Sequence, residues 1–119
     1  MITYKRLDHV YLSVPPGKEY EAHLFYTEVL GFVPMERPSV FDSTGYWYRL
    51  PGMEIHTGAE NGKPLTKPHF AMEVADLEAA RQHLESKGVA IVKEVPIPGR
   101  NRFAFYDPFG NRIELLEYV

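Results

Sequence analysis

Hydrophobic and polar positions along the first half of the chain predict one strand, one helix and three further strands. Residues 7–14 alternate between apolar and polar side chains in the manner of a half-buried strand. From Glu19 to Leu30 the apolar residues recur at helical spacing, and Gly31 is well placed to end the helix. Short runs with strand character follow at residues 32–35, 46–50 and 53–57.

The same order of elements begins again after a polar stretch at about residues 59–67. Asp76 is placed to cap a helix that ends at Gly88. The strands of this second half are expected at residues 68–74, 89–92, 102–106 and 112–118. The sequence therefore predicts an α+β fold of two tandem β-α-β-β-β modules, at about residues 5–58 and 68–119. We expect their sheets to form one cupped mixed sheet in a single domain.

Four of the predicted strands each direct a potential metal ligand away from the face that packs under a helix. Alternate residues of a strand share a face, so His9 and His56 lie opposite the apolar positions of their strands, as do His69 and Glu114. In each half the pair lies on the first and last strands, 47 positions apart in the first half and 45 in the second. Three imidazoles and a carboxylate suit a divalent ion such as Zn, Ni, Fe or Mn. One strand histidine alone is more often structural, so the repeated spacing carries this prediction.

Other polar residues of the same faces could perform proton transfer. Glu54 and Glu73 are candidate general bases and Tyr11 is a candidate hydrogen-bond donor, although such residues are more often simply solvated. The remaining histidines, His23 and His83, fall in predicted helices and are expected at the surface. The candidate catalytic residues are Glu114, Glu54 and Tyr11.

An aromatic strand offers a candidate substrate pocket. Residues 46–49 are three aromatic residues followed by a cation, so alternate side chains could line an apolar pocket. Arg49 or Arg102 could then bind an anionic group. The pattern does not decide which alternate set faces the pocket, and both arginines could equally be surface residues. The candidate substrate-binding residues are Trp47, Arg49 and Arg102.

Composition narrows the class of protein without naming a reaction. The 119 residues carry a net charge of -3 with no cluster of Lys and Arg, which argues against a nucleic-acid partner. No apolar stretch approaches the ~18 residues of a membrane span, and the first 14 residues lack a signal-peptide core. Because cysteine is absent, any metal would need nitrogen and oxygen ligands. We expect a cytoplasmic protein that binds a small molecule.

Three segments resemble a known family across essentially the whole chain. Leu-Asp-His-Val at residues 7–10, Phe-Tyr-Thr-Glu-Val-Leu-Gly-Phe at 25–32 and Asp-Pro-Phe-Gly-Asn-Arg-Ile-Glu-Leu at 107–115 are similar to motifs of the glyoxalase, bleomycin-resistance and extradiol-dioxygenase superfamily, the vicinal oxygen chelate proteins. The resemblance implies the paired-module fold and homodimers in which two chains complete each site. It also implies a divalent metal ion in the cup. The implied ligands are His9, His69, Glu114 and, at the fourth position, His56.

The departures from the family pattern leave the reaction open. Bacterial glyoxalase I enzymes carry Glu at the fourth position, whereas this chain has His56, with Glu54 two residues earlier. Fosfomycin thiol transferases carry Thr where this chain has Tyr11, and bleomycin-binding members keep the fold but lose the ligands. The resemblance implies a metal-dependent lyase or isomerase acting on a small oxygenated substrate. The alternative is a sequestering, non-catalytic binding protein, and a dioxygenase is a third option.

Overall fold

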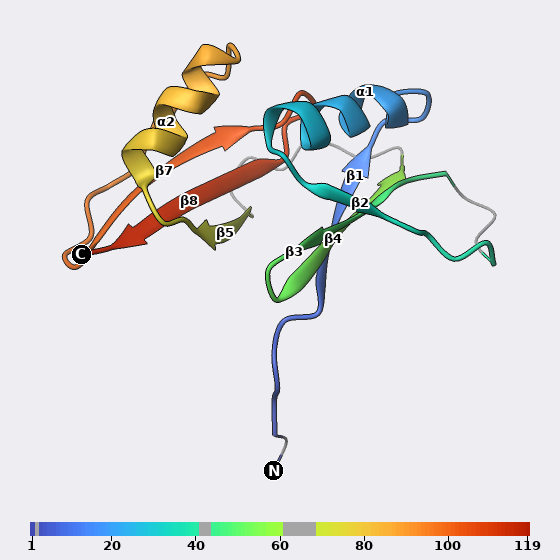
Figure 1. Ribbon diagram of the computed structural model, residues 1–119, viewed down its shortest axis with the longest axis horizontal. Coiled ribbons are helices and arrows are strands. Elements are labelled where there is room, and N and C mark those ends of the chain that lie inside the picture. The colour runs from blue at the N-terminus through green and yellow to red at the C-terminus, as the bar shows by residue number, and fades with distance from the viewer. Residues whose placement is uncertain (2, 41–43, 61–68) are drawn as a thin grey trace. The chain divides into compact units, whose positions relative to one another are not determined.

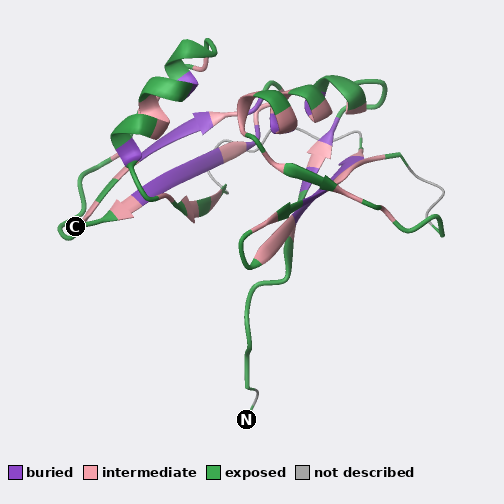
Figure 2. Ribbon diagram, viewed as in Figure 1, coloured by how far each residue is buried: buried purple, intermediate pink, exposed green. Residues whose placement is uncertain are grey.

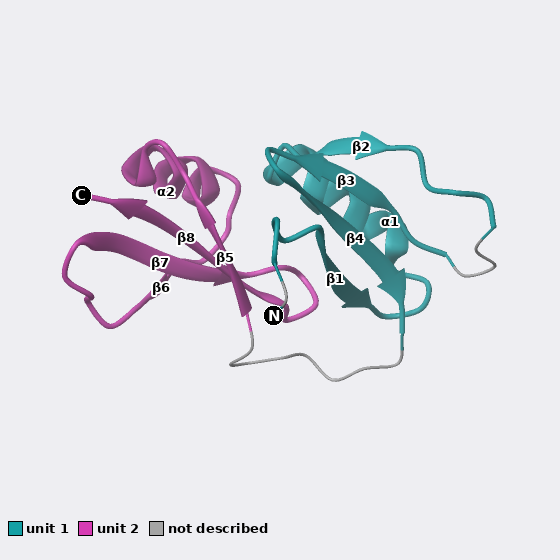
Figure 3. Cartoon of the chain, turned by 90° about the horizontal axis from the view of Figure 1, so that it is seen from below, with its two compact units in different colours: residues 1–62 teal, residues 63–119 magenta. Residues whose placement is uncertain are grey.

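The computed structural model describes residues 1, 3–40, 44–60 and 69–119, and the chain divides into two compact units, residues 1–62 and 63–119 (Figures 1 and 3). Each unit contains one four-stranded mixed sheet and one helical segment between its first two strands. The predicted α+β fold of two β-α-β-β-β modules is therefore confirmed. No helix in the described part of the chain is long and apolar enough to cross a membrane.

Unit 1 builds its sheet around a parallel pair made by its first and last strands. Strand β1 pairs in parallel with β4, and the remaining neighbours pair antiparallel in the order β1-β4-β3-β2. Strand β4 continues to Ala59, so the predicted linker starts later than expected, and residues 61–67 of that linker lie outside the described residues. The elements in chain order are β1 (His9–Val14), α1 (Glu19–Leu24), η1 (Phe25–Val29), β2 (Val33–Met35), β3 (Trp47–Leu50) and β4 (Met53–Ala59).

The helical segment of unit 1 changes its hydrogen-bonding pattern halfway. The α-helix α1 ends at Leu24 and continues as the π-helix η1, in which the amide of Leu30 donates to the carbonyl of Phe25 at 3.1 Å. The hydroxyl of Thr27 donates to the carbonyl of His23 at 2.7 Å and so competes for an acceptor that a regular α-helix gives to a backbone amide. Gly31, with φ of 73°, follows the helical segment as predicted.

One face of the unit 1 sheet packs under this helical segment. Tyr26, Tyr48 and Ile55 are fully buried between the two layers. His23 also belongs to this packing, because its Nδ1 is hydrogen bonded to the hydroxyl of Tyr48 at 2.9 Å and its ring stacks on Tyr46 with centroids 4.1 Å apart. The prediction that His23 is a surface residue is therefore wrong. Its helix position turns it toward the sheet.

Unit 2 repeats the arrangement with a regular helix. Strand β5 pairs in parallel with β8, and the sheet order is β5-β8-β7-β6 with antiparallel neighbours otherwise. Buried residues of β7 and β8 (purple in Figure 2) form a core with Leu77 and Leu84 of α2. Strand β6 is shorter than predicted, and β7 begins two residues earlier. The elements are β5 (His69–Glu73), α2 (Leu77–Ser86), β6 (Val92–Lys93), β7 (Arg100–Tyr106) and β8 (Arg112–Tyr118).

The cap of α2 offers a direct test of the local structure. The carboxylate Oδ1 of Asp76 accepts a hydrogen bond from the amide of Ala79 at 3.0 Å. We expect Asp76→Ala to lower the free energy of unfolding by about 1 kcal/mol, because an amide of the first turn loses its partner. Urea unfolding followed by circular dichroism measures this change. Asp76→Asn keeps an acceptor and serves as the control; a loss as large as that of Asp76→Ala would contradict the capping role.

Candidate functional site

The strand register gives the two predicted ligand pairs the same backbone placement. In each unit the first strand begins with a histidine, and the residue two positions later is the register partner of the second predicted ligand. These partners are Tyr11 for His56 and Ala71 for Glu114. His56 of unit 1 is therefore the structural equivalent of Glu114 of unit 2. The register partners are His9 with Glu54 and Tyr11 with His56 in unit 1, and His69 with Arg112 and Ala71 with Glu114 in unit 2.

A tight turn before β8 helps to position Glu114. The buried Asp107 accepts hydrogen bonds from the amides of Phe109 and Asn111 at 2.9 and 2.8 Å, and Asn111 Nδ2 donates to its other oxygen at 2.7 Å. Gly110 closes the turn with φ of 89°. The Asp-Pro-Phe-Gly-Asn motif is thus a structural device that fixes where β8 begins and which face Glu114 occupies.

The ligand pair of unit 1 belongs to a stack of three rings. The rings of His9 and His56 lie 4.3 Å apart at an interplanar angle of 15°. Trp47 of β3 packs against His56, with centroids 3.8 Å apart and planes within 3°. His56 is 8% exposed, whereas His9 is exposed. The stack fixes the plane of His56 between its two neighbours.

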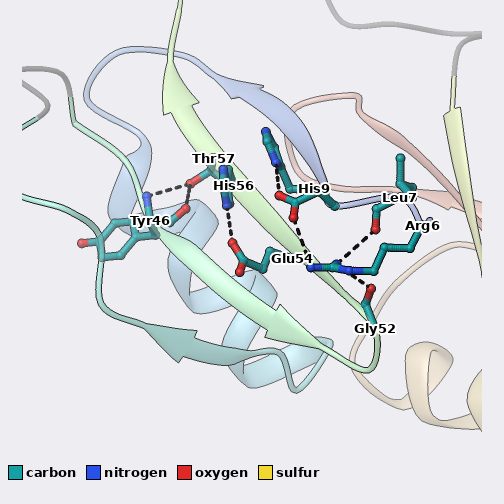
Figure 4. Close-up of polar contacts among 9 residues, drawn as sticks. Arg6, Leu7, His9, Tyr46, Gly52, Glu54, His56 and Thr57 are labelled. Carbon is teal, nitrogen blue, oxygen red and sulfur yellow. Dashed lines mark hydrogen bonds and ion pairs between the residues drawn. The ribbon is translucent and has the colours of Figure 1, made fainter. Parts of the chain in front are cut away.

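Carboxylates orient both of these imidazoles (Figure 4). His9 Nδ1 is hydrogen bonded to Asp8 Oδ2 at 2.8 Å, and this bond together with nearby Arg6 lowers the pKa of the Asp8 carboxyl. His56 Nε2 is hydrogen bonded to Glu54 Oε1 at 2.8 Å. The half-buried Glu54 therefore contacts the His56 ring directly, as expected for residues i and i+2 of one strand face.

In unit 2 the two predicted ligands contact each other, and an arginine binds the carboxylate of the pair. His69 Nε2 lies 3.3 Å from Glu114 Oε1, and Arg102 Nη1 donates to the same oxygen at 3.0 Å. Glu114 is 5% exposed, so its charge is compensated within the unit rather than by water. Sequence reasoning considered Arg102 for an anionic substrate group, and the structure places it against Glu114.

The contact continues into a buried ionic chain, which we define as Arg112, Glu94, Arg102 and Glu114. Glu94 lies between the two arginines, close to Arg112 and 4.0 Å from Arg102. Arg102 Nη2 also donates to the carbonyl of Val95 at 2.9 Å. Each side chain of the ionic chain is at most 18% exposed. The sequence did not reveal that Glu94 and Arg112 belong to this ionic chain. The one available signal was that Arg112 and Glu114 are two residues apart on β8 and therefore share a sheet face.

Two of the remaining candidates, on strand β3, lie on the same sheet face as His56. Trp47 and Arg49 lie on the same face as His56, because they pair across the strands with His56 and Glu54, whereas Tyr48 faces the helix. Arg49 and Glu73 are exposed.

Tyr11 lies on the same sheet face as the histidine pair of unit 1 and keeps its phenolic proton at neutral pH. It is 48% exposed. Burial of part of the ring and the neighbouring Glu60 carboxylate raise the pKa of the Tyr11 phenol. A hydrogen bond to the Glu60 carboxylate contributes to this rise, so the phenol would donate to a substrate by exchanging that acceptor.

Each unit thus supplies two donor side chains at equivalent positions. Within the described residues no group of three or more His, Asp or Glu side chains comes together as a metal site. A catalytic metal ion commonly takes three or more protein ligands. One such pair alone falls short of that number.

Comparison with known proteins gives a consistent result. Residues 6–115 match the family model of the Glyoxalase/Bleomycin resistance protein/Dioxygenase superfamily. The chain is 29% identical over 121 residues to Glyoxylase I 4 of Arabidopsis thaliana, an alignment covering 92% of this chain and 68% of that protein. A solved structure from Bacillus anthracis, described as a putative glyoxalase family protein, is 34% identical with a TM-score of 0.93 over 100% of both chains. TnmS3, an antibiotic binding protein from Streptomyces sp. CB03234, shares the fold at 24% identity, with a TM-score of 0.72 over 99% of this chain and 98% of that one.

The ionic chain predicts an unequal response to two arginine substitutions. Arg102→Gln leaves the buried Glu114 without its arginine, whereas Glu94 keeps Arg112, so we expect the free energy of unfolding to fall by about 3 kcal/mol. Arg81→Gln removes a cation that pairs with Glu78 and Glu85 on the surface of α2, and its effect should be small. Urea unfolding of both variants gives the comparison. Equal effects would show that the ionic chain is not a significant source of stability.

Proposed function

The chain belongs to the glyoxalase/bleomycin resistance protein/dioxygenase superfamily, and from this membership we propose that it is a metal-dependent lyase or isomerase acting on a small oxygenated substrate. The observation that carries the proposal is the repeated ligand pair. Two units place His9 with His56 and His69 with Glu114 at the same register positions of a parallel strand pair. Both units thus offer two side chains of metal-ligating type at matching backbone positions.

The donor atoms of the described residues fit a divalent ion. Two ligands at about 2.1 Å from a tetrahedral ion lie about 3.4 Å apart, and the His69 and Glu114 donor atoms are 3.3 Å apart. His9 is bonded to Asp8 through Nδ1, which leaves Nε2 for a metal and supplies the usual outer-shell carboxylate. His56 has Nε2 occupied by Glu54, so its role as fourth ligand is the least supported. We propose His9, His69 and Glu114 as ligands of Zn, Ni, Fe or Mn, with His56 at the fourth position.

The side chains near the metal ion would each have a separate role in the reaction. A bound metal ion would supply Lewis acidity toward two adjacent substrate oxygens. Glu54, half-buried and held by His56, would accept the substrate proton, and Tyr11 would donate a hydrogen bond to a substrate oxygen. Arg102 would orient Glu114, as an outer-shell residue does for a ligating carboxylate.

We further propose that the protein works as a cytoplasmic homodimer. Homodimers in which two chains complete each site are what the superfamily resemblance implies, and superfamily membership supports this proposal. The absence of cysteine suits a reducing compartment, where disulfides would not persist.

A second candidate function is sequestration of a small molecule without turnover. It is favoured by the aromatic residues on the uncovered face of unit 1, where Tyr11 is 48% exposed and Trp47 is half-buried. A sequestering protein would keep its ligand affinity when Glu114 is replaced by Gln, because no metal ion would take part in binding.

Metal binding tests the proposed ligand set. We expect about one ion per chain after loading with Ni, Zn, Mn or Fe and removal of free metal, measured by plasma mass spectrometry. Glu114→Gln and His69→Ala should each weaken metal affinity more than about 100-fold, since the loss of an outer-shell partner alone costs 10–100-fold. His83→Ala, on the exposed surface of α2, is the matched control. A chain that bound none of the four metals would rule out the metalloenzyme and leave sequestration.

Proton transfer tests the role of Glu54. With the metal-loaded protein in D2O, we expect exchange of the protons next to the carbonyl group in small α-hydroxycarbonyl compounds, followed by NMR. Glu54→Gln should slow this exchange by about 10²–10⁴-fold with metal content unchanged, because it removes the base but keeps the shape. Glu73→Gln, on the exposed edge of β5, is the control. Equal exchange rates in the Glu54 variant and the unchanged protein would assign the base elsewhere.

A further inference from the structure

The face of the unit 1 sheet opposite α1 and η1 contains a pocket whose size and lining point to a particular kind of ligand. The pocket has a volume of about 470 Å³, within the range of small-molecule sites. A single benzene-sized ring would fill only a small part of it. Four aromatic side chains line it, together with Arg37 and Glu60; the four are His9, Tyr11, Trp47 and His56.

One wall of the pocket is the three-ring stack. Trp47 and His56 are nearly parallel, and His9 continues the stack at an angle of 15°. Rings fixed by their neighbours in this way have little freedom left to lose when a ligand packs against them. His56 shares its faces with His9 and Trp47, so the stack leaves the outer faces of those two rings for a partner that is itself flat.

The floor of the pocket depends on a glycine. At Gly58 a Cβ atom would lie 2.3 Å from the hydroxyl oxygen of Tyr11 and within 2.9 Å of its ring carbons. The missing side chain thus lets the Tyr11 ring lie directly on the backbone of β4. Because Tyr11 is 48% exposed, the rest of the ring remains available to a ligand.

We propose that this pocket binds a flat, multi-ring aromatic compound, which on the proposed function is the ring system of the substrate. The lining favours ring stacking over aliphatic packing, because aromatic pairs gain interaction energy beyond the area that they bury. Arg37 and Glu60 carry opposite charges at the pocket, so the lining does not select a cation or an anion. The expected ligand is therefore a neutral ring system carrying oxygen substituents.

The single tryptophan provides the measurement. Trp47 is the one tryptophan of the 119-residue chain, so its indole N–H gives an unambiguous NMR signal inside the pocket. The metal-free full-length protein is titrated with 2-naphthol and, separately, with decahydro-2-naphthol, which keeps the hydroxyl and the two-ring skeleton but is puckered. We expect a saturable shift with 2-naphthol and about fivefold or more weaker binding of the saturated alcohol.

Two variants and a control locate the binding. Tyr11→Leu removes a ring, and Gly58→Ala displaces it, so both should weaken 2-naphthol binding. Tyr20→Leu removes an exposed tyrosine of α1 and should leave affinity unchanged. Equal affinity for the two alcohols, no shift with 2-naphthol, or indifference to Tyr11→Leu would each overturn the inference. An indole shift that follows protein concentration without responding to 2-naphthol would overturn it in favour of a second copy covering the pocket. The titration needs no metal. If 2-naphthol did not bind but the protein still bound a metal ion, the inference would be wrong and the proposed function would stand.

Discussion

The parallel pairing of the first strand with the last strand of each unit is the constraint on which the candidate site depends. A parallel ladder fixes which residues stand side by side, and a slip of one residue would turn every side chain to the other face. In both units the register sets the second donor opposite the position two residues after the first-strand histidine. The helical connection covers one face with apolar residues and leaves the donors on the other. Fold and site are therefore products of the same hydrogen-bond ladder.

Short-range patterns predicted much of this arrangement. Alternation along β1, β4, β5 and β8 gave both the buried faces and the placement of His9, His56, His69 and Glu114 on the opposite ones, because side-chain direction in a strand depends only on parity. The contact of Glu54 with His56 follows from the same rule. The partner of Arg102 could not be predicted, since it depends on how β7 aligns with β8 and on a loop residue, Glu94. The packing of His23 against the sheet was missed because the helical pattern alone does not reveal a stacking partner such as Tyr46.

The two units use equivalent positions for different physical purposes. Around His56 the neighbours are rings, so the environment is apolar and flat, with one carboxylate bonded to the imidazole. Around Glu114 the neighbours are charges, and the ionic chain compensates a carboxylate that burial would otherwise penalise. Arg112 occupies in unit 2 the register position that Glu54 occupies in unit 1, so the sign of the charge is reversed there. A repeated backbone thus carries one half suited to an organic ligand and one suited to holding an anionic donor.

The π-helix η1 has a consequence for the dynamics of unit 1. The π-helix is a rare, usually single-turn form, and here the carbonyl of His23 accepts a hydrogen bond from the Thr27 hydroxyl. Local opening free energies follow the quality of such bonds, so the amides of Phe25–Val29 should exchange with solvent sooner than those of the longer regular helix α2. The buried ring of Tyr26 resists such opening from within the same segment. The helical layer of unit 1 is consequently anchored by the buried Ala22 and Tyr26 and expected to open more readily than α2 along η1.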